Sequence, residues 1–406
     1  MQNKKIFLII IWLTTVAFYM YTRMMNTSLS AFSIPLISDF HFSSIDIAWA
    51  ISAYSLAMLM MKIPVGMLVD RYGIDFPLMF AMSMVLIGTV IFAFAFTPTL
   101  LLFSRFLMGI GTAFAMMSAY RLTSIVLSKK LFAIATGFIY FFGSLAVSMS
   151  GLPLNQAVQN YAYSSVILFL ACILAMILIV YLLARLAHGK LPQTGDIKTF
   201  RDYFIGLKTI FKEKQILFTI LYSSFFTCVF FNTIGYWGNN ILIHTKLPNA
   251  DEAGLIGNSI ASIASGVASI VVGFIIATQY LKTKHIAFFT TLATLAVVII
   301  FYTNITNIYA LVIASLFFGL GFGFTGIAFD TANKCNQTYL VSILSILFLI
   351  EYILNSILNP LAAYIQKTLV AHDFSTFTSY QFAYGIFFGL LILANILSFY
   401  IKPQKV

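Results

Sequence analysis

The segment GMLVDRYG, residues 66–73, joins two long apolar runs of the sequence, 45–68 and 76–96. A run of about 20 mostly apolar residues is long enough to cross a bilayer as a helix. Reading outward from this segment in both directions gives twelve such runs, separated by charged or turn-rich breaks. We expect membrane spans at residues 6–34, 45–68, 76–96, 99–126, 131–153, 161–186, 215–243, 253–279, 284–303, 307–331, 338–366 and 379–401.

The composition of the whole chain agrees with a membrane protein. Of its 406 residues, 61% are hydrophobic and only 9% are charged, whereas an ordinary soluble domain is about 45–50% apolar and about 25% charged. This balance excludes a soluble enzyme, a nucleic-acid-binding protein and a disordered chain. Long continuous apolar runs favour helices over a β-barrel, whose strands alternate in polarity. The sequence therefore predicts an all-α membrane protein.

Charged residues predict how the chain is oriented and divided. The polar segment 187–214 is rich in Lys and Arg, and part of it, 199–212, has the apolar periodicity of a helix on the membrane surface. If both ends are cytoplasmic, the outer side carries only Lys246 and Lys367 among the loop cations, which is a strong positive-inside signal. We expect a six-helix bundle over 1–186, a cytoplasmic linker with a surface helix over 187–214, and a second six-helix bundle over 215–406.

The two halves of the sequence resemble each other. The segment FLMGIGTAFA, residues 106–115, is similar to LFFGLGFGFT, residues 316–325, so that Gly109 pairs with Gly319 and Gly111 with Gly321. The offset of the two segments is about half the chain, which indicates a duplication of six spans.

The segment at 66–73 resembles the signature G-x-L-x-D-R-x-G of the Major Facilitator Superfamily, which lies between the second and third spans. Arg105 with Gly109 and Gly111 is similar to a second element of that family, R-x-x-x-G-x-G. The resemblance implies twelve helices in two pseudo-symmetric six-helix bundles that rock about a central site. It also implies a cytoplasmic gate formed by Gly66, Asp70, Arg71 and Gly73. Gly66 would let neighbouring helices approach closely, and Asp70 can accept hydrogen bonds from a helix N-terminus or an arginine.

Two further patterns bear on the branch of the family. Span 5 carries Gly151 and Pro153 but lacks the Gly-Pro pair typical of drug-exporting antiporters. Tyr21-Thr22-Arg23 together with Ile63-Pro64-Val65-Gly66 resembles the organic-anion and phosphate-ester branches, and also the phagosomal amino-acid and nucleoside transporters of intracellular bacteria.

Ionisable residues inside spans are expensive and mark candidate functional sites. Arg23 shares one face of its helix with Tyr19 and Asn26, and a guanidinium there would bind a carboxylate or phosphate in a two-pronged manner. We expect these three residues to bind substrate. The alternatives are an Arg23 side chain that reaches the outer interface or a structural pair with another span.

Glu351 is the carboxylate nearest the middle of any span, and Asn355 lies on the same helix face. Protonation near neutral pH is possible for a carboxyl group buried away from water, so Glu351 is a candidate for proton coupling or for contact with a substrate amine. The alternative is a static ion pair with a cation such as Arg105, Lys62 or Arg23. We interpret Arg105 and Lys62 as structural or charge-pairing residues.

The family plan, in which spans 1, 4, 7 and 10 line the cavity, implies two more candidates in span 7. Asn232 and Tyr236 share a face there and provide donors and acceptors for a polar solute. Together with Arg23, Tyr19, Asn26 and Asn355 they form the predicted substrate site.

The sequence shows no Walker loop, zinc motif, nucleophile elbow or dinucleotide fingerprint in a usable context. Its three cysteines have no paired spacing. We therefore expect no enzyme activity, no cofactor and no metal, and transport driven by an ion or solute gradient.

The resulting hypothesis is a monomeric importer in a bacterial inner membrane, with both ends cytoplasmic. It would carry a small polar metabolite with a carboxylate, such as an amino acid or organic acid, together with protons. Its partners are the solute, the coupling proton and the lipid bilayer, and no nucleic acid. The alternatives are an exchanger of organic anions or phosphate esters, an exporter of drugs or siderophores, and a solute sensor that does not transport.

Overall fold

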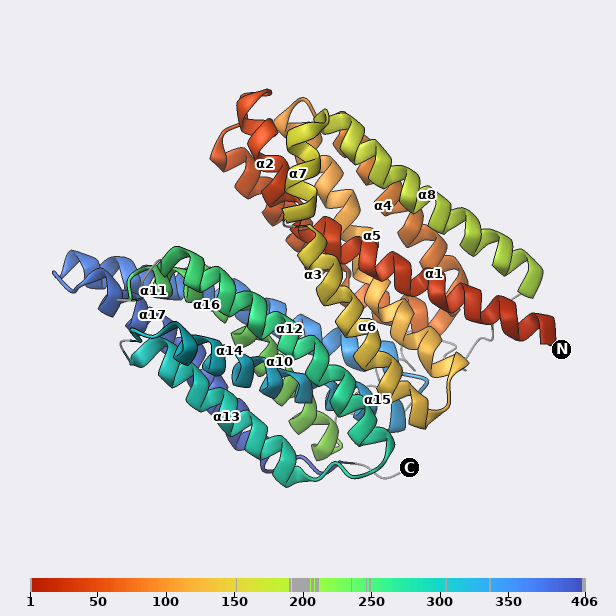
Figure 1. Ribbon diagram of the computed structural model, residues 1–406. Coiled ribbons are helices and arrows are strands. Elements are labelled where there is room, and N and C mark those ends of the chain that lie inside the picture. Colours follow the sequence, from red (N-terminus) through yellow and green to blue (C-terminus); the bar gives the residue numbers. More distant parts are fainter. Residues whose placement is uncertain are drawn as a thin grey trace. The chain divides into compact units, whose positions relative to one another are not determined.

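The computed structural model describes residues 2–150, 152–189, 191, 205, 208, 212–234, 236–245, 247, 250–303, 305–335 and 337–403. Every regular element among them is a helix, as Figure 1 shows. Twelve helical stretches in this part of the chain are long and apolar enough to cross a membrane. The expectation of an all-α membrane protein with twelve spans is confirmed. These spans are Lys5–Thr27, Trp49–Tyr72, Asp75–Ala93, Pro98–Val126, Lys129–Asn160, Tyr163–His188, Lys214–Thr233, Ile256–Ala277, Thr283–Tyr302, Ile308–Cys335, Leu340–Ala371 and Thr376–Ser398.

The chain forms two compact units. The first comprises Met1–Ser128, Phe142–Ile205 and Asn336–Ser345, and the second comprises Lys129–Phe141, Gly206–Cys335 and Ile346–Val406. A short piece of each half of the sequence therefore belongs to the unit formed mainly by the other half. The expected linker over 187–214 lies largely outside the described residues, so its surface helix and the expected domain boundaries stay predictions.

The first unit is built from helices of the N-terminal half. Figure 1 shows α8 running beside α1 and α4, while α5 packs against α1, α3 and α4. The helices of this half are α1 (Gln2–Thr27), α2 (Leu29–Ser38), α3 (Ser44–Tyr72), α4 (Asp75–Ala93), α5 (Pro98–Val126), α6 (Lys129–Met149), α7 (Leu152–Asn160) and α8 (Tyr163–His188), and the part of α6 up to Phe141 belongs to the second unit. At the start of α3, the Ser43 hydroxyl accepts from the Asp46 amide while the Asp46 carboxylate accepts from Ser43. This capping box satisfies amide groups that the helix leaves open and lowers the pKa of Asp46.

The second unit repeats the arrangement with helices of the C-terminal half. They are α10 (Lys214–Thr233), α11 (Tyr236–Ile243), α12 (Ala250–Ala277), α13 (Thr283–Tyr302), α14 (Ile308–Gly323), a 3₁₀ turn η1 (Phe324–Gly326), α15 (Ile327–Cys335), α16 (Leu340–Ala371) and α17 (Thr376–Ser398), and the part of α16 up to Ser345 belongs to the first unit. Here α14 packs against α12 and α13, as α5 packs against α3 and α4 in the first unit.

The paired glycines make equivalent close contacts in the two units. A Cβ on Gly109 of α5 would lie 2.4 Å from a backbone oxygen of α3, and a Cβ on Gly319 of α14 would lie 2.3 Å from a backbone oxygen of α12. Gly111 and Gly321 stand in the same way against α4 and α13, where a Cβ would come within 2.4 Å and 2.5 Å of atoms of those helices. The repeat that the sequence indicates therefore preserves the positions where two helices approach with no side chain between them.

Several spans that the sequence predicts as continuous are interrupted. The first span breaks at Ser28, between α1 and α2, and the seventh breaks between α10 and α11. The fifth span breaks between α6 and α7, just before Pro153, and the tenth passes through the 3₁₀ turn η1. Side-chain hydroxyls support the first break, because Thr27 donates to carbonyls of the last turn of α1 and Ser28 donates to Met25. Apolar periodicity alone does not reveal such breaks.

Candidate functional site

Asp70 lies at the end of α3 and caps the start of α16, within the first unit. One carboxylate oxygen accepts from the backbone amide of Ser342 at 2.8 Å and from the Ser342 hydroxyl. Arg121 of α5 is within electrostatic reach of Asp70 and donates to the backbone oxygen of Gln337. A carboxylate at a helix N-terminus compensates the partial positive charge of the open amides. Asp70 thus holds the first turn of α16 against α3.

The two glycines of the same segment have separate geometric roles. A Cβ on Gly66 would lie 2.9 Å from the Cα of Ser342, so α3 and α16 touch backbone to backbone there. Gly73 ends α3 with a φ of 77°, a conformation that L side chains rarely adopt. Arg71 places its guanidinium 5.0 Å from the ring centre of Tyr72. The structure thus gives Gly66, Asp70 and Gly73 local contacts, while their action as a gate stays a prediction.

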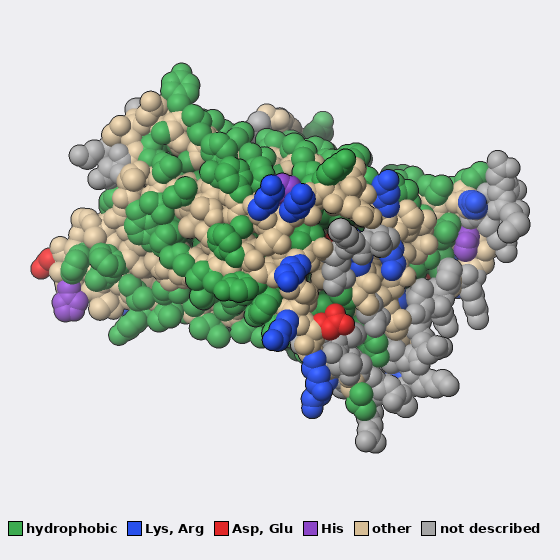
Figure 2. All heavy atoms as spheres, turned by 90° about the horizontal axis from the view of Figure 1, so that it is seen from below, with side chains coloured by type: hydrophobic (Ala, Val, Ile, Leu, Met, Phe, Trp, Pro, Cys, Tyr) green, Lys and Arg blue, Asp and Glu red, His purple; other side chains and the backbone are tan. Residues whose placement is uncertain are grey.

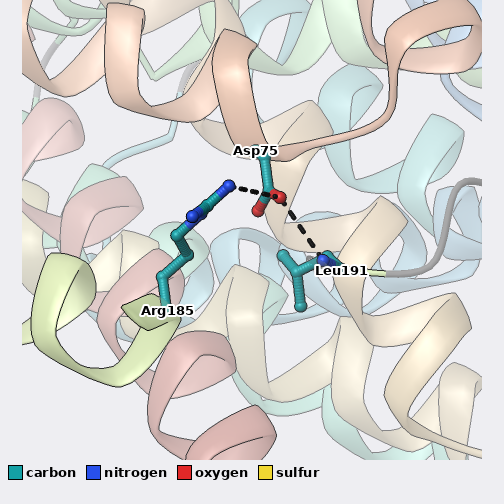
Figure 3. A network of polar contacts seen from close by, with 3 residues as sticks. All are labelled: Asp75, Arg185 and Leu191. Carbon is teal, nitrogen blue, oxygen red and sulfur yellow. Dashed lines mark hydrogen bonds and ion pairs between the residues drawn. The ribbon is translucent and has the colours of Figure 1, made fainter. Parts of the chain in front are cut away.

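A second polar contact ties the start of α4 to the end of α8 (Figure 3). The Arg185 guanidinium lies 3.4 Å from a carboxylate oxygen of Asp75, and that oxygen also accepts from the Leu191 amide at 3.3 Å. Both side chains are partly exposed, so the pair contributes about 0–1 kcal/mol. Each charge has the favourable sign for the helix end it occupies.

Arg105 braces the break between α1 and α2. It is 1% exposed, and its two terminal nitrogens donate to the backbone oxygens of Met25 and Asn26 at 2.9 and 3.2 Å. Its guanidinium also stacks over the ring of Tyr54, 4.5 Å from the centroid. A cation that donates to the last carbonyl oxygens of a helix satisfies groups left without an intrahelical partner. This geometry gives Arg105 a structural role at the end of α1.

The predicted stripe on α1 partly faces into the first unit. Tyr19 is buried against α6, where a Cβ on Gly143 would lie 2.8 Å from the tyrosine hydroxyl. Arg23 is half-buried, one turn further along, and lies within electrostatic reach of the phenol oxygens of Tyr19 and Tyr54. Asn26 is also half-buried, and its backbone oxygen accepts from Arg105.

In the second unit, polar residues of α10 face polar residues of α16. We call this the polar seam, and it comprises Ser224, Cys228 and Asn232 of α10 with Glu351, Asn355 and the backbone oxygen of Leu347 of α16. The Asn232 amide donates to the side-chain oxygen of Asn355 at 2.6 Å, and the Cys228 thiol donates to the same oxygen at 3.3 Å. One turn away, the Ser224 hydroxyl donates to the backbone oxygen of Leu347 at 2.8 Å.

Glu351 occupies the middle of the polar seam. It is 6% exposed, lies one helical turn from Asn355, and is within electrostatic reach of Cys228. The structure thus brings together three residues that the sequence predicts as site residues, namely Asn232, Glu351 and Asn355. The side chain of Tyr236 lies outside the described residues, so its predicted role is not tested.

The seam continues through Trp237. Its indole nitrogen donates to the side-chain oxygen of Asn359 at 2.7 Å, and Asn359 in turn donates to the backbone oxygen of Asn355 at 2.9 Å. The seam residues Ser224 and Cys228, which sequence reasoning did not select, repeat at intervals of four with Asn232. Polar side chains at this spacing within an apolar helix are the signal that could have found them.

The remaining ionisable residues within the spans have different surroundings. Lys62 is 5% exposed, within α3. Asp330 and Lys334 form a buried ion pair of 2.8 Å on α15. Among the residues that the structure describes, no group of three His, Cys, Asp or Glu side chains is close enough to hold a metal ion.

Comparison with known proteins decides the family. The model of the Major Facilitator Superfamily matches residues 11–338 of this chain. The chain belongs to the Major Facilitator Superfamily. Two solved structures share the fold, both of the transporter FucP. One, in an outward conformation, has a TM-score of 0.71 at 14% identity and covers 98% of this chain and 100% of FucP. The other is a variant of the Escherichia coli fucose:proton symporter, with a TM-score of 0.67 at 13% identity and the same coverage of the two chains.

Two curated members are similar over part of the sequence. The vesicular acetylcholine transporter unc-17 of Caenorhabditis elegans is 27% identical over 175 residues, which are 40% of this chain and 32% of that protein. The vesicular acetylcholine transporter of Drosophila melanogaster is 28% identical over 173 residues, 41% of this chain and 29% of that protein. The match thus spans about a third of each relative. As a member of this family, the chain is a multi-pass membrane transporter.

Proposed function

We propose that this chain is a proton-coupled symporter that imports a small polar metabolite carrying a carboxylate, such as an amino acid or organic acid. It would do so across a bacterial inner membrane with both chain ends in the cytoplasm. Arg23 binds the carboxylate, and Glu351 takes the coupling proton or the substrate amine. The Asp70–Arg71 segment stabilises the state that is closed to the cytoplasm.

The observation that carries this proposal is the position of Glu351 in the polar seam. A carboxyl group in an apolar membrane environment is costly when charged and unpaired, so such groups are retained where they move protons or bind cations. The neighbouring amides of Asn232 and Asn355 and the thiol of Cys228 supply donors and acceptors in an otherwise apolar helix pair. Glu351 can therefore alternate between a protonated and an ionised form without leaving a polar surrounding.

The geometry of Arg23 supports an anionic group on the substrate. The guanidinium is half-buried on α1 and lies within electrostatic reach of the phenol groups of Tyr19 and Tyr54. A guanidinium forms two parallel hydrogen bonds to a carboxylate, which fixes the orientation of the bound group. Asn26, one turn further along the same face, offers an amide for the remaining polar atoms of the solute.

A thermal-shift screen tests the substrate class. Purified protein is heated in the presence of amino acids, organic acids, phosphate esters and nucleosides. A ligand present at 100 times its Kd stabilises the folded state by about 2.7 kcal/mol. We expect a carboxylate-bearing solute to raise the melting temperature of the wild type and of Arg185→Gln, the matched control, but not that of Arg23→Gln. A neutral hit, or an equal response of Arg23→Gln, would contradict the role of Arg23.

A second candidate substrate is a cationic amine. The two vesicular acetylcholine transporters that resemble part of this chain carry a quaternary ammonium compound, and Glu351 is a suitable counter-charge. In that case the binding of the amine would depend on Glu351 and persist in Arg23→Gln. The same screen, extended to choline esters and polyamines, separates the two substrate classes.

A further inference from the structure

A small pocket in the second unit is lined by three lysines. Its volume is about 110 Å³, which is room for a few water-sized groups. We call it the lysine pocket, and its lining residues are Lys129, Lys130, Ile276, Ala277, Gln279 and Lys334. It has no part in the polar seam or in the contacts of Asp70.

Three helix ends build the lysine pocket. Lys129 and Lys130 form the first turn of α6, Gln279 follows the end of α12, and Lys334 lies in the last turn of α15. The backbones of α6 and α12 touch just beyond the pocket. There, a Cβ on Gly137 would lie 2.4 Å from the backbone oxygen of Ser269. This contact fixes the distance between two walls of the pocket.

The charges at the start of α6 favour an anion. Two lysines occupy a first turn that contains no acidic residue, and the Ser128 side chain does not cap the helix. Cations at a helix N-terminus are repelled by the positive end of the helix dipole. A bound anion would therefore offset the repulsion among the lysines and accept hydrogen bonds from the unpaired amides of the first turn. Neither lysine pairs with a carboxylate of any residue that the structure describes.

The opposite side of the pocket adds no net negative charge. Lys334 pairs with Asp330 at 2.8 Å, so these two charges balance. The last carbonyls of α12 already accept from the backbone amides of Thr278, Gln279 and Tyr280. Figure 2 shows Lys and Arg side chains among hydrophobic ones on the face that it draws, and basic side chains at a membrane surface attract anionic headgroups.

We propose that the lysine pocket binds a phosphate group, which is supplied by an anionic phospholipid headgroup or by free phosphate. Lys129 and Lys130 supply the charge, and the first amides of α6 supply hydrogen-bond donors. Because the pocket is lined by α6, α12 and α15, its ligand stabilises the packing of these three helices in the second unit.

The test compares two double variants that remove the same charge. The first variant, Lys129→Gln with Lys130→Gln, removes the net positive charge of the pocket. The second, Lys282→Gln with Lys284→Gln, removes two exposed lysines that do not line the pocket but follow its residue Gln279 closely in the sequence. Binding of phosphatidylglycerol and phosphatidylcholine to each purified protein is measured by native mass spectrometry. In parallel, the melting temperature is measured with and without inorganic phosphate, and the melting curve without ligand shows that each variant is folded.

We expect phosphatidylglycerol to bind the wild type and the 282/284 variant alike, and the 129/130 variant about tenfold more weakly. A melting-temperature rise with inorganic phosphate that only the 129/130 variant loses, without preferential lipid binding, would assign the site to free phosphate. Equal losses in both double variants would overturn the proposal in favour of a diffuse basic surface. Equal binding of the neutral and the anionic lipid would overturn it as well.

Discussion

Arg105 illustrates how much one residue can depend on its tertiary surroundings. The sequence places it in the family element R-x-x-x-G-x-G, and the structure shows its two terminal nitrogens on the backbone oxygens of Met25 and Asn26. Those oxygens belong to the last turn of α1, where the helix breaks. A hydrogen bond from a charged donor to such a group is worth about 1.5–3 kcal/mol.

We predict that Arg105→Gln lowers the apparent melting temperature of the protein by several degrees more than Arg185→Gln does. Arg105 is buried and bridges two carbonyls, whereas the Arg185–Asp75 pair is partly exposed and contributes about 0–1 kcal/mol. The melting temperature of Arg105→Lys should lie between those of the two Gln variants. An ammonium keeps the positive charge but lacks the planar guanidinium that donates to two carbonyls at once. Melting curves of the three purified variants check the order, and equal shifts for both Gln variants would contradict the bracing role.

At the scale of elements, the spacing between helices is set by a few glycines. Gly319 brings α14 against α12, with a Cβ position only 2.3 Å from the Ala261 oxygen, whereas Gly389 of α17 has open space around its Cβ position. Glycine is therefore required for close helix packing at position 319, whereas position 389 has room for a side chain.

We predict that Gly319→Ala destabilises the protein by about 1–3 kcal/mol, because the added methyl forces two backbones apart. Gly389→Ala should leave stability unchanged or raise it slightly, because alanine has the higher helix propensity. Gly109→Ala, the equivalent change in the first unit, should resemble Gly319→Ala. Apparent melting temperatures of the three variants in detergent test this, and a loss in Gly389→Ala as large as the other two would refute it.

The start of α16 offers a second prediction at this scale. Asp70→Asn keeps the shape of the side chain but removes the charge that faces the open amides of α16. We expect a loss of about 1 kcal/mol in stability and a larger fractional loss of transport. Asp75→Asn is the matched control, because that carboxylate is more exposed. If both variants transport alike, the proposed gating role of Asp70 is wrong.

For the whole molecule, the repeat extends beyond the glycines. The Tyr21 hydroxyl meets the Thr89 hydroxyl at 3.2 Å, and Tyr222 meets Thr290 at 3.0 Å, so the same bond joins the first and third spans of each half. The residues proposed for the activity do not follow this symmetry, because Arg23 lies in the first unit and Glu351 in the second. A duplicated scaffold thus carries two unlike polar sites.

We predict that uptake into proteoliposomes accelerates when the outside is made acidic, because the proton gradient drives a symporter. Glu351→Gln should lose this acceleration while still exchanging labelled for unlabelled substrate, since a neutral amide cannot carry a proton through the cycle. Glu213→Gln, a change of an exposed carboxylate next to α10, is the matched control and should behave as wild type. Unaltered pH dependence in Glu351→Gln would rule out its coupling role.

The sequence by itself determined the number of spans, the helical class and the duplication. Apolar length, and glycines at equivalent positions, depend only on local composition and on the requirement that backbone groups pair within each helix in lipid. It also marked Glu351, Asn232 and Asn355, because polar residues are rare in such helices. Only the tertiary structure decided which of these meet, since that depends on how distant helices rotate and approach.

The helix breaks were decided at the tertiary level too. The break at Ser28 is stabilised by Arg105, almost eighty residues away in the chain, which donates hydrogen bonds to the carbonyl oxygens that the break leaves open. The same holds for Asp70, whose partners are amides of α16 from the other half of the sequence. A hydrogen bond between residues far apart in sequence leaves no periodicity to read, and only the packed structure shows it.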